Sequence, residues 1–356
     1  MYFLTLKDIK SMTLDEIKAD FAAERQPAFR ALQVYKWLHR GVADFSEMSD
    51  QSKSFRQELS KKYYIANAVI ERKYVSKIDG TIKYLFLLDD GEHVESVLMS
   101  YHHGHTICIS TQVGCKMNCA FCATGKSGFA RNLSASEMLA QIQTAQNDVG
   151  IRISNVVLMG MGEPLDNYEN VLRFLNLVSS ENGLNIGMRH ISLSTCGVVD
   201  KIYDLADKKL QITLSVSLHA PNDKIRSNTM PVNKKWGVDE LLKACRYYAD
   251  KTGRRISFEY AMINGVNDND DCARELANKL SGMLSHVNLI PVNNVSGAEF
   301  KKSSLDRLQK FSRVLSNKGI AVTVRRTLGS DINASCGQLR RRYKEEVANV
   351  ENIQQE

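Results

Sequence analysis

The chain has 356 residues, of which 43% are hydrophobic and 24% charged, and its formal net charge is +7. No apolar run approaches eighteen residues and no basic start precedes an apolar stretch, so we expect neither a membrane span nor a signal peptide. The eight cysteines are therefore expected to be reduced thiols, catalysts or metal ligands in the cytoplasm, which excludes a disulfide framework.

The first 65 or so residues have apolar side chains at three- and four-residue spacing, which predicts helices in "TLDEIKADFAA", "AFRALQVYKWLHR" and "KSFRQELSKKY". Thr13 and Glu16 fit a capping box at the start of the first helix. The apolar period then changes to two, and "TIKYLFLLDDGEHVESVLMS" predicts two strands around an Asp-Asp-Gly turn. We therefore expect a helical accessory domain over residues 1–68 and a β-hairpin linker over 69–104.

From residue 105 onward, strand patterns and helix patterns alternate. The expected strands are "HTICIST", "NVVLMGMG", "RHISLSTCG", "QITLSVSLHA", "RISFEYAMI" and "HVNLIPVN", followed by "AVTVRRT". Apolar strands separated by amphipathic helices indicate parallel βαβ units that are covered on both faces. Six units are too few for a closed eight-stranded barrel. We predict an α/β protein with a partial (β/α)6 barrel over 105–328 and a basic segment over 329–356.

Three cysteines follow the first predicted barrel strand with the spacing CxxxCxxC: Cys115, Cys119 and Cys122. Thiolates at this spacing suit zinc or an iron–sulfur cluster. Structural zinc needs four closed ligands, whereas a four-iron cluster held by three cysteines leaves one iron open to a substrate. Cys108 could supply a fourth ligand, but it lies within the strand before the loop. From the spacing alone, a zinc site and ordinary buried thiols remain open alternatives.

The cysteine loop and the motif "GMGEP" at residues 160–164 together resemble the radical S-adenosylmethionine (SAM) superfamily. In that superfamily the open iron of a [4Fe–4S] cluster binds SAM, and reduction of SAM yields methionine and a 5′-deoxyadenosyl radical. "GMGEP" alone could be an ordinary βα turn, but here it lies one βα unit after the cysteines. The resemblance implies that Cys115, Cys119 and Cys122 hold the cluster. The SAM contacts that it implies are Gly162, Glu163, Ser194, Ser217, Leu218, His219 and Asn293.

Further stretches extend the resemblance to nearly the whole chain. "PAFRALQVYKWLH", "CISTQVGCKMNCAFCATG", "GMGEPLDNYENV", "SLHAPND", "MPVNKKW" and "DINASCGQLR" resemble the RlmN family, whose members methylate C2 of adenine in RNA. The related Cfr family methylates C8 of the same adenine and has Ala in place of Pro164. Small departures from the RlmN pattern occur at Asn294, Asn333 and Ser335. The implied targets are adenine 2503 of 23S rRNA and adenine 37 of certain tRNAs.

The family chemistry assigns roles to residues outside the cysteine loop. The C2 carbon of adenine is not a nucleophile and cannot take a methyl group directly from SAM, whereas a thiolate can. The resemblance implies that Cys336 carries the methyl group, that Cys108 resolves the RNA adduct through a transient disulfide, and that Glu95 accepts the proton, with two SAM consumed per turnover. From the residues alone, the two cysteines could be small buried hydrophobes and Glu95 could belong to the polar face of a strand.

Positive charge concentrates near the end of the chain. Residues 301–346 carry twelve Lys or Arg and four Asp or Glu, a balance of +8, so the remainder sums to about −1. This bias suggests a polyanionic partner, although a solvated helical face is the simpler explanation. The basic residues expected to contact RNA are Arg325, Arg326, Arg340, Arg341 and Arg342, and in the N-terminal helices Arg25, Arg30, Lys36 and Arg40. We expect 23S rRNA and tRNA as substrates, an electron donor such as flavodoxin, and a monomer.

Two other classes of protein remain compatible with the residues alone. A non-catalytic zinc-bearing RNA-binding protein would use the three loop cysteines and one further thiol as ligands. An electron-transfer iron–sulfur protein would use Cys108 as the fourth ligand and would not bind SAM. Neither class requires "GMGEP" or Cys336. His102, His103 and His105 could form a separate metal site, but a polar hairpin loop is the simpler explanation.

Overall fold

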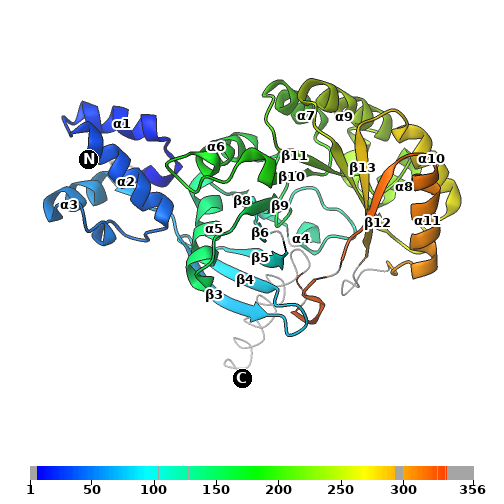
Figure 1. Cartoon of the computed structure of the whole chain (residues 1–356), viewed down its shortest axis with the longest axis horizontal. Helices are drawn as coiled ribbons and strands as arrows, with labels where there is room; N and C mark the ends of the chain where they lie inside the picture. The colour runs from blue at the N-terminus through cyan, green and yellow to red at the C-terminus, as the bar shows by residue number, and fades with distance from the viewer. Residues whose placement is uncertain are drawn as a thin grey trace.

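A ten-stranded sheet forms the centre of the molecule (Figure 1). The computed structural model describes residues 6–102, 104–126, 128–292, 300–326, 328–332 and 334. Within these ranges, the parallel part of the sheet consists of β6 (Gly104–Cys108), β9 (Asn155–Leu158), β10 (Ile191–Thr195), β11 (Thr213–Ser217), β12 (Ile256–Met262), β13 (Ser285–Pro291) and β14 (Ala321–Val324). Strands β9 to β12 and β14 lie inside the strand patterns expected from residue 105 onward, and β6 and β13 each begin one residue before their pattern. The predicted α/β partial barrel is therefore confirmed.

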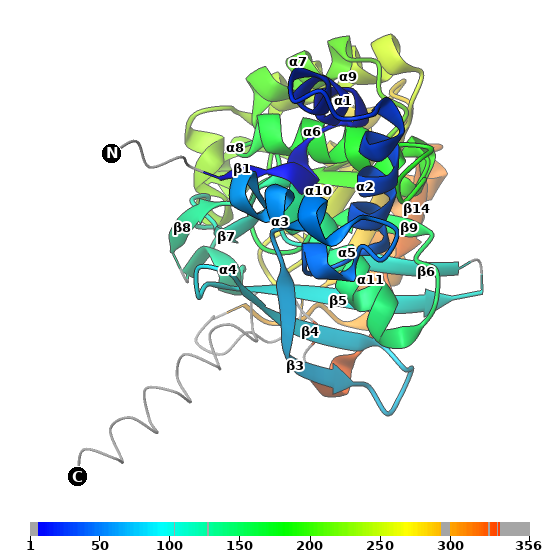
Figure 2. The same ribbon diagram turned by 90° about the vertical axis from the view of Figure 1, so that its left-hand side faces the viewer.

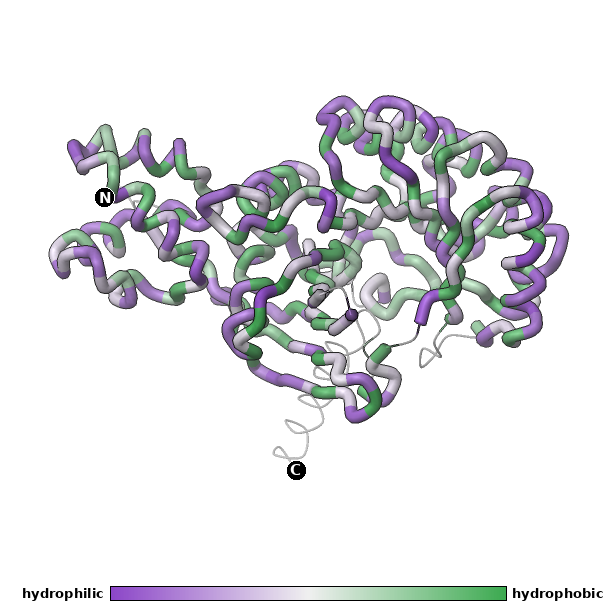
Figure 3. The backbone as a smooth tube through the Cα atoms, viewed as in Figure 1, coloured by the Kyte–Doolittle hydropathy of each residue, from purple (hydrophilic) through white to green (hydrophobic). Residues whose placement is uncertain are grey.

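Helices cover the outer side of the parallel strands (Figure 1). They are α5 (Ala135–Val149), α6 (Tyr168–Ser179), α7 (Val199–Asp207), α8 (Asp223–Thr229), α9 (Val238–Thr252), α10 (Asp270–Leu280) and α11 (Leu305–Asn317). Their apolar faces turn toward the sheet, and Figure 3 shows the hydrophobic residues gathered along the strands and the inner sides of the helices. In the part of the chain that the structure describes, no helix is long and apolar enough to cross a membrane.

Three antiparallel strands extend the barrel sheet at one edge: β3 (Ala68–Val75), β4 (Ile82–Leu88) and β5 (His93–Tyr101). Strand β5 pairs with β6, so that Val97 lies opposite Cys108. The segment expected to be a two-stranded hairpin therefore has a third strand and is hydrogen-bonded directly to the barrel. This continuity places Glu95, on β5, and Cys108, on β6, on neighbouring strands.

The N-terminal helices are α1 (Leu14–Ala23), α2 (Ala28–Arg40) and α3 (Lys53–Lys62), and β1 (Lys7–Asp8) pairs with β2 (Tyr63–Tyr64) beside them. The predicted capping box is confirmed, because Thr13 Oγ1 accepts from the N–H of Glu16 at 3.2 Å and Glu16 Oε2 accepts from the N–H of Thr13 at 2.7 Å. Arg173 of α6 donates to Glu16 at 2.6 Å, and Gln143 of α5 donates to the carbonyl of Leu38 at 2.9 Å. The N-terminal helices thus dock on the barrel beside α5 and α6 (Figures 1 and 2).

Candidate active site

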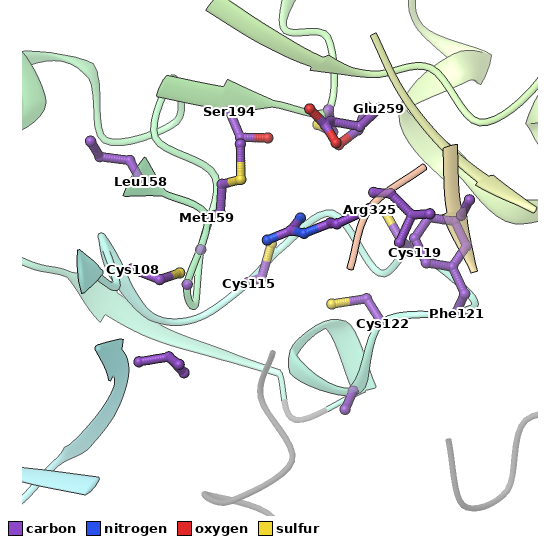
Figure 4. A pocket seen from close by; sticks show the side chains of 18 of the residues that line it. Cys108, Cys115, Cys119, Phe121, Cys122, Leu158, Met159, Ser194, Glu259 and Arg325 are labelled. Carbon is purple, nitrogen blue, oxygen red and sulfur yellow. The ribbon is translucent and has the colours of Figure 1, made fainter. Parts of the chain in front are cut away.

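A cavity of about 370 Å³ lies at the carboxyl ends of the parallel strands. Its lining includes most of the residues singled out in the sequence, namely Glu95, Cys108, Cys115, Cys119, Cys122, Gly162, Glu163, Ser194, Ser217 and His219. Several of them are seen in Figure 4. Leu218 is fully buried next to the cavity and is not part of its lining. Asn293 and Cys336 lie outside the described residues.

The cysteine loop is held at its start, its middle and its end. It follows β7 (Gln112–Gly114), which pairs with β8 (Phe129–Asn132), and the N–H of Cys115 donates to the carbonyl of Gly128 at 2.9 Å. The N–H of Ala120 donates to the carbonyl of Thr229, and that of Cys122 to the carbonyl of Cys119. The short helix α4 (Ala123–Lys126) then begins. These bonds fix the loop so that all three thiols line the same cavity (Figure 4).

The environment of the loop thiols fits a cationic iron–sulfur centre. Burial raises the pKa of Cys115 to about 12, and it also raises the pKa of Cys119, with further increases from the negative charges of Cys122 and Glu163. Buried thiols of this kind stay protonated unless a metal centre stabilises the thiolates. Within the described ranges, no three His, Cys, Asp or Glu side chains lie close enough to hold a single metal ion. A four-iron cluster does not require such closeness, because each thiolate binds a different iron.

Gln112 joins the cysteine loop to the "GMGEP" loop after β9. Its backbone N–H donates to the carbonyl of Met161 at 3.1 Å, and its Oε1 accepts from the N–H of Glu163 at 2.9 Å. Its Nε2 donates to Asp166 at 2.8 Å. Gly162 has φ +105°, and a Cβ atom built there would lie 2.6 Å from Cβ of Gln112. The close approach of the two loops therefore requires glycine at position 162.

The Glu163 carboxylate is buried and held by backbone donors on both of its oxygens. Oε2 accepts from the N–H of Cys196 at 2.7 Å, and Oε1 accepts from the N–H of Leu165 at 3.0 Å. Burial raises the pKa of Glu163, although the same two N–H groups act in the opposite direction. The site thus contains a rigidly oriented carboxyl group beside the three thiols, suited to accept a hydrogen bond from an amino group.

His219 occupies a strained and fully enclosed position after β11. Its φ is +57°, and its side chain is only 5% exposed. Nδ1 accepts from the N–H of Ala261 at 2.9 Å, and the ring meets Phe121 edge-on with 4.8 Å between centroids. Burial, and secondarily the charge of Arg226, lower the pKa of His219 to about 3. The imidazole is therefore a neutral, immobile wall of the cavity, and the hydrogen bond on Nδ1 places the ring proton on Nε2.

Glu95 and Cys108 also line the cavity. Glu95 is 4% exposed, and Lys83 Nζ lies 3.6 Å from its Oε2. Cys108 ends β6 and is partly exposed. Among the cysteines that the structure describes, none forms a disulfide. A carboxylate and a further thiol thus belong to the same cavity as the loop thiols.

Sequence reasoning missed one acidic side chain of the cavity and did not anticipate that a predicted RNA-binding arginine lines it. Glu259 of β12 is 5% exposed, and its carboxylate accepts from Asn288 at 2.8 Å and from Ser257 at 3.1 Å. Its charged side chain within the apolar run "RISFEYAMI" was the available signal. Arg325 was grouped with RNA-binding residues, yet it reaches into the same cavity (Figure 4). Burial raises the pKa of Glu259, and the charge of Arg325 opposes that rise.

Of the other predicted residues that the structure describes, Arg326 also lines the cavity, and the rest lie among the N-terminal helices and in the β5–β6 hairpin. Arg25, Lys36 and Arg40 are exposed on the N-terminal helices and Arg30 is half-buried. His105 contacts Ser100 Oγ through Nδ1 at 3.1 Å, and His103, Arg340, Arg341 and Arg342 lie outside the described residues. The described part of the β5–β6 turn therefore gives no support to a metal site among the histidines.

Comparison with known proteins gives matches along most of the chain. Residues 7–65 match the "Ribosomal RNA large subunit methyltransferase N-terminal domain", and residues 109–276 match the "Radical SAM superfamily". The chain is 56% identical to "Probable dual-specificity RNA methyltransferase RlmN" of Alkaliphilus oremlandii, over 94% of this chain and 98% of that protein. It is 54% identical to the protein of the same name from Clostridium botulinum, over 95% and 97%.

A solved structure supports the same relationship. The crystal structure of a radical SAM methyltransferase from Sphaerobacter thermophilus superposes with a TM-score of 0.89. It is 44% identical in sequence, and the match covers 93% of this chain and 98% of that one. The similarity therefore includes both the N-terminal helices and the barrel.

Proposed function

Because the chain belongs to the RlmN family of the radical SAM superfamily, we propose that it methylates C2 of adenine in RNA. The observation that carries this proposal is the convergence of the three CxxxCxxC thiols, Glu95 and Cys108 on one cavity at the carboxyl ends of the strands. The proposed substrates are adenine 2503 of 23S rRNA and adenine 37 of tRNA. A flavodoxin-like protein is the proposed electron donor.

The residues that would hold the cofactors are those already placed around the cavity. Cys115, Cys119 and Cys122 would hold one [4Fe–4S] cluster, and its fourth iron would remain open for SAM. The SAM molecule would contact Gly162, Glu163, Ser194, Ser217, Leu218, His219 and Asn293. When bound, the cluster and SAM supply a 5′-deoxyadenosyl radical.

The other residues of the chain would carry the methyl group and resolve the RNA adduct. Cys336 takes a methyl group from a first SAM, and loss of one hydrogen atom from that S-methyl group lets its carbon bond to C2 of adenine. Glu95 then accepts the C2 proton, and the adduct gives up one electron, which balances the electron spent on the second SAM. Cys108 then attacks the sulfur of Cys336, the bond between that sulfur and the methylene carbon breaks, and the carbon takes up a proton to become the methyl group on C2. The disulfide between Cys108 and Cys336 that remains is reduced by cellular thiols.

Two alternatives differ in product or in cofactor. A Cfr-like enzyme would place the methyl group on C8, and the names of the curated relatives favour C2. A zinc-bearing RNA-binding protein would neither bind SAM nor modify RNA. The described thiols lack the closeness that a single zinc ion requires, which favours the cluster.

The test begins with anaerobic purification, reconstitution with iron and sulfide, and electron paramagnetic resonance of the reduced protein with and without SAM. A four-iron signal that changes on SAM addition is expected. Reaction with 23S rRNA fragments and tRNA transcripts, followed by nucleoside mass spectrometry, should then yield 2-methyladenosine. The Cys336→Ala variant should keep the signal and form no product. Formation of 8-methyladenosine, or a colourless protein with bound zinc, would overturn the proposal.

A further inference from the structure

The turn between β3 and β4 binds a segment that lies some 250 positions later in the chain. Asp331 Oδ1 accepts from Ser76 Oγ at 2.7 Å, and Asp331 Oδ2 accepts from the N–H of Lys77 at 2.8 Å. In the opposite direction, Asp79 Oδ2 accepts from the N–H of Gly329 at 2.8 Å. Figures 1 and 2 both show the segment after β14 lying against this turn. The turn and the later segment thus each supply an aspartate that accepts from a backbone N–H group of the other.

Hydrogen bonds within the turn orient the groups that contact the later segment. The N–H of Ser76 donates to the carbonyl of Thr81 at 2.8 Å, and the N–H of Thr81 donates to Asp79 Oδ1 at 3.0 Å. Ser76 Oγ also accepts from the N–H of Ile78 at 3.2 Å. Burial acts to raise the pKa of Asp79, but the N–H groups of Gly329 and Thr81 outweigh it and lower that pKa to about 2. The turn is therefore a preorganised acceptor that loses little entropy on binding.

The bound segment leads from the turn to the wall of the active-site cavity. Leu328 and Ala334 both line that cavity, on either side of the anchored residues. Cys336 follows Ala334 by two positions in the sequence. Two residues of chain span at most about 7 Å. The anchor at Asp331 therefore stands five positions before the proposed methyl carrier, at the edge of the cavity that the carrier must enter.

We infer that the β3–β4 turn is an anchor that positions Cys336 at the cavity, with Ser76 and Asp331 as positioning residues. This inference rests on the proposed function for the role of Cys336. The proposed reaction brings that sulfur successively to SAM, to the base and to Cys108, three partners inside one cavity. Tethering the segment at its base raises the effective concentration of the thiol for all three. Neither positioning residue touches a reacting atom.

The test measures this effective concentration without requiring RNA methylation. Holoenzyme with its reconstituted cluster is equilibrated anaerobically in buffers with fixed ratios of reduced to oxidised glutathione. Oxidised glutathione takes two electrons from Cys108 and Cys336, which leaves their disulfide and two reduced glutathione molecules. Alkylation and peptide mass spectrometry then give the disulfide fraction, and the equilibrium with glutathione gives the effective concentration of the two thiols.

Asp331→Ala and Ser76→Ala are each expected to lower the effective concentration about tenfold, and Ser76→Ala should add little in the Asp331→Ala background because the two residues share one bond. Ser76→Thr keeps the hydroxyl group and should have the same effective concentration as the wild type. The matched control is Asp44→Ala, since Asp44 is exposed and its Oδ1 accepts from the N–H of Ser46 at 2.7 Å in the N-terminal helical part of the chain. Its value should equal that of the wild type.

Two results would overturn the anchor. One is an unchanged effective concentration in Asp331→Ala when its unfolding temperature matches that of the control. The other is failure of the wild type to form the disulfide at any glutathione ratio. A tenfold effect in a protein that yields no methylated RNA would support the anchor while removing the proposed function, so the two failures are distinguishable.

Discussion

Lys83 Nζ lies 3.6 Å from Glu95 Oε2, and the two side chains are only 1% and 4% exposed. Lys83 belongs to β4 and Glu95 to β5, so the pair crosses two antiparallel strands next to the cavity. A buried carboxylate loses the solvation that water would give it, and the ammonium group replaces part of that solvation. The ammonium group of Lys83 therefore stabilises the charged carboxylate of Glu95 at a buried position, where an apolar side chain would be the usual occupant.

Replacing Lys83 with Met should lower the free energy of unfolding by about 3 kcal/mol, because a buried charge loses its counter-charge. Glu95→Gln should also destabilise the protein, and the double variant should lose less than the sum of the two. Urea denaturation of the four proteins gives the coupling, expected at about 1 to 3 kcal/mol. The exposed pair Lys310–Asp306, 2.9 Å apart, is the control and should couple by less than about 0.5 kcal/mol. Additive effects of the buried pair would contradict the argument.

Glu163→Gln should weaken SAM binding at least tenfold in the reconstituted protein. Both carboxylate oxygens accept backbone N–H groups, and a glutamine side chain has only one acceptor oxygen. One N–H group would therefore face an NH2 group, and the side chain would turn away from its present orientation. Equilibrium dialysis with labelled SAM measures the effect, with the exposed Glu169→Gln in α6 as control. An unchanged dissociation constant would show that the orientation of this carboxyl group is unimportant.

Gly162→Ala should be more destabilising than Gly265→Ala, although both glycines have positive φ. The φ angles are +105° and +71°, but only at Gly162 would a Cβ atom meet neighbours, at 2.6 Å from Cβ of Gln112. We expect Gly265→Ala to cost about 1 kcal/mol from backbone strain alone. Gly162→Ala should cost about 2 kcal/mol more, because the cysteine loop must move. Thermal unfolding compares the two variants, and equal losses would refute a role for the contact.

His39 should make the protein less stable as the pH falls from 6.5 toward 4. Burial, and secondarily the charge of Lys10, lower the pKa of His39 to about 4, from 6.5 in an unfolded chain. Between these values the unfolded chain binds a proton that the folded protein does not, so stability declines with falling pH, by about 3 kcal/mol in all. His39→Leu should flatten this part of the stability profile. The exposed His190→Gln is the control for the loss of a histidine, and an unchanged slope in His39→Leu would contradict the argument.

The strands and helices of the barrel could be predicted from the sequence because the hydrophobic patterns that identify them are local. Parallel strands covered on both faces are short apolar runs, and amphipathic helices separate them, so the parallel strands β6 and β9 to β14 could be located from their own residues. The short antiparallel pair β7 and β8 beside the cysteine loop was not predicted. The loops after the strands could be placed at one edge of the sheet by the same reasoning. Ten residues of the predicted site do line one cavity. Their roles in binding or catalysis remain predictions.

Other features depend on contacts between distant segments, which no local pattern encodes. Strand β3 alternates half-buried and exposed residues in "AVIERKYV" after a buried Ala68, a weak pattern for an edge strand that carries four charged or polar side chains. Asp331 is an ordinary acidic residue until folding brings it to Ser76. Arg325 belongs to a basic stretch whose charge suggested RNA, and only the sheet places it at the cavity.

The pairing of β5 with β6 also determines where Glu95 lies relative to Cys108. Glu95 and Ser96 of β5 both line the cavity, and Val97 lies opposite Cys108, so a slip of one residue in this register would move Glu95 by one position relative to the thiol. The register of the two strands therefore sets the distance between the carboxylate and the thiol. A single-residue insertion between Glu95 and Val97 would leave the cysteine and glycine motifs intact and still move the carboxylate relative to Cys108. In this fold, spacing along the chain outside the motifs is as much a part of the active site as the motifs themselves.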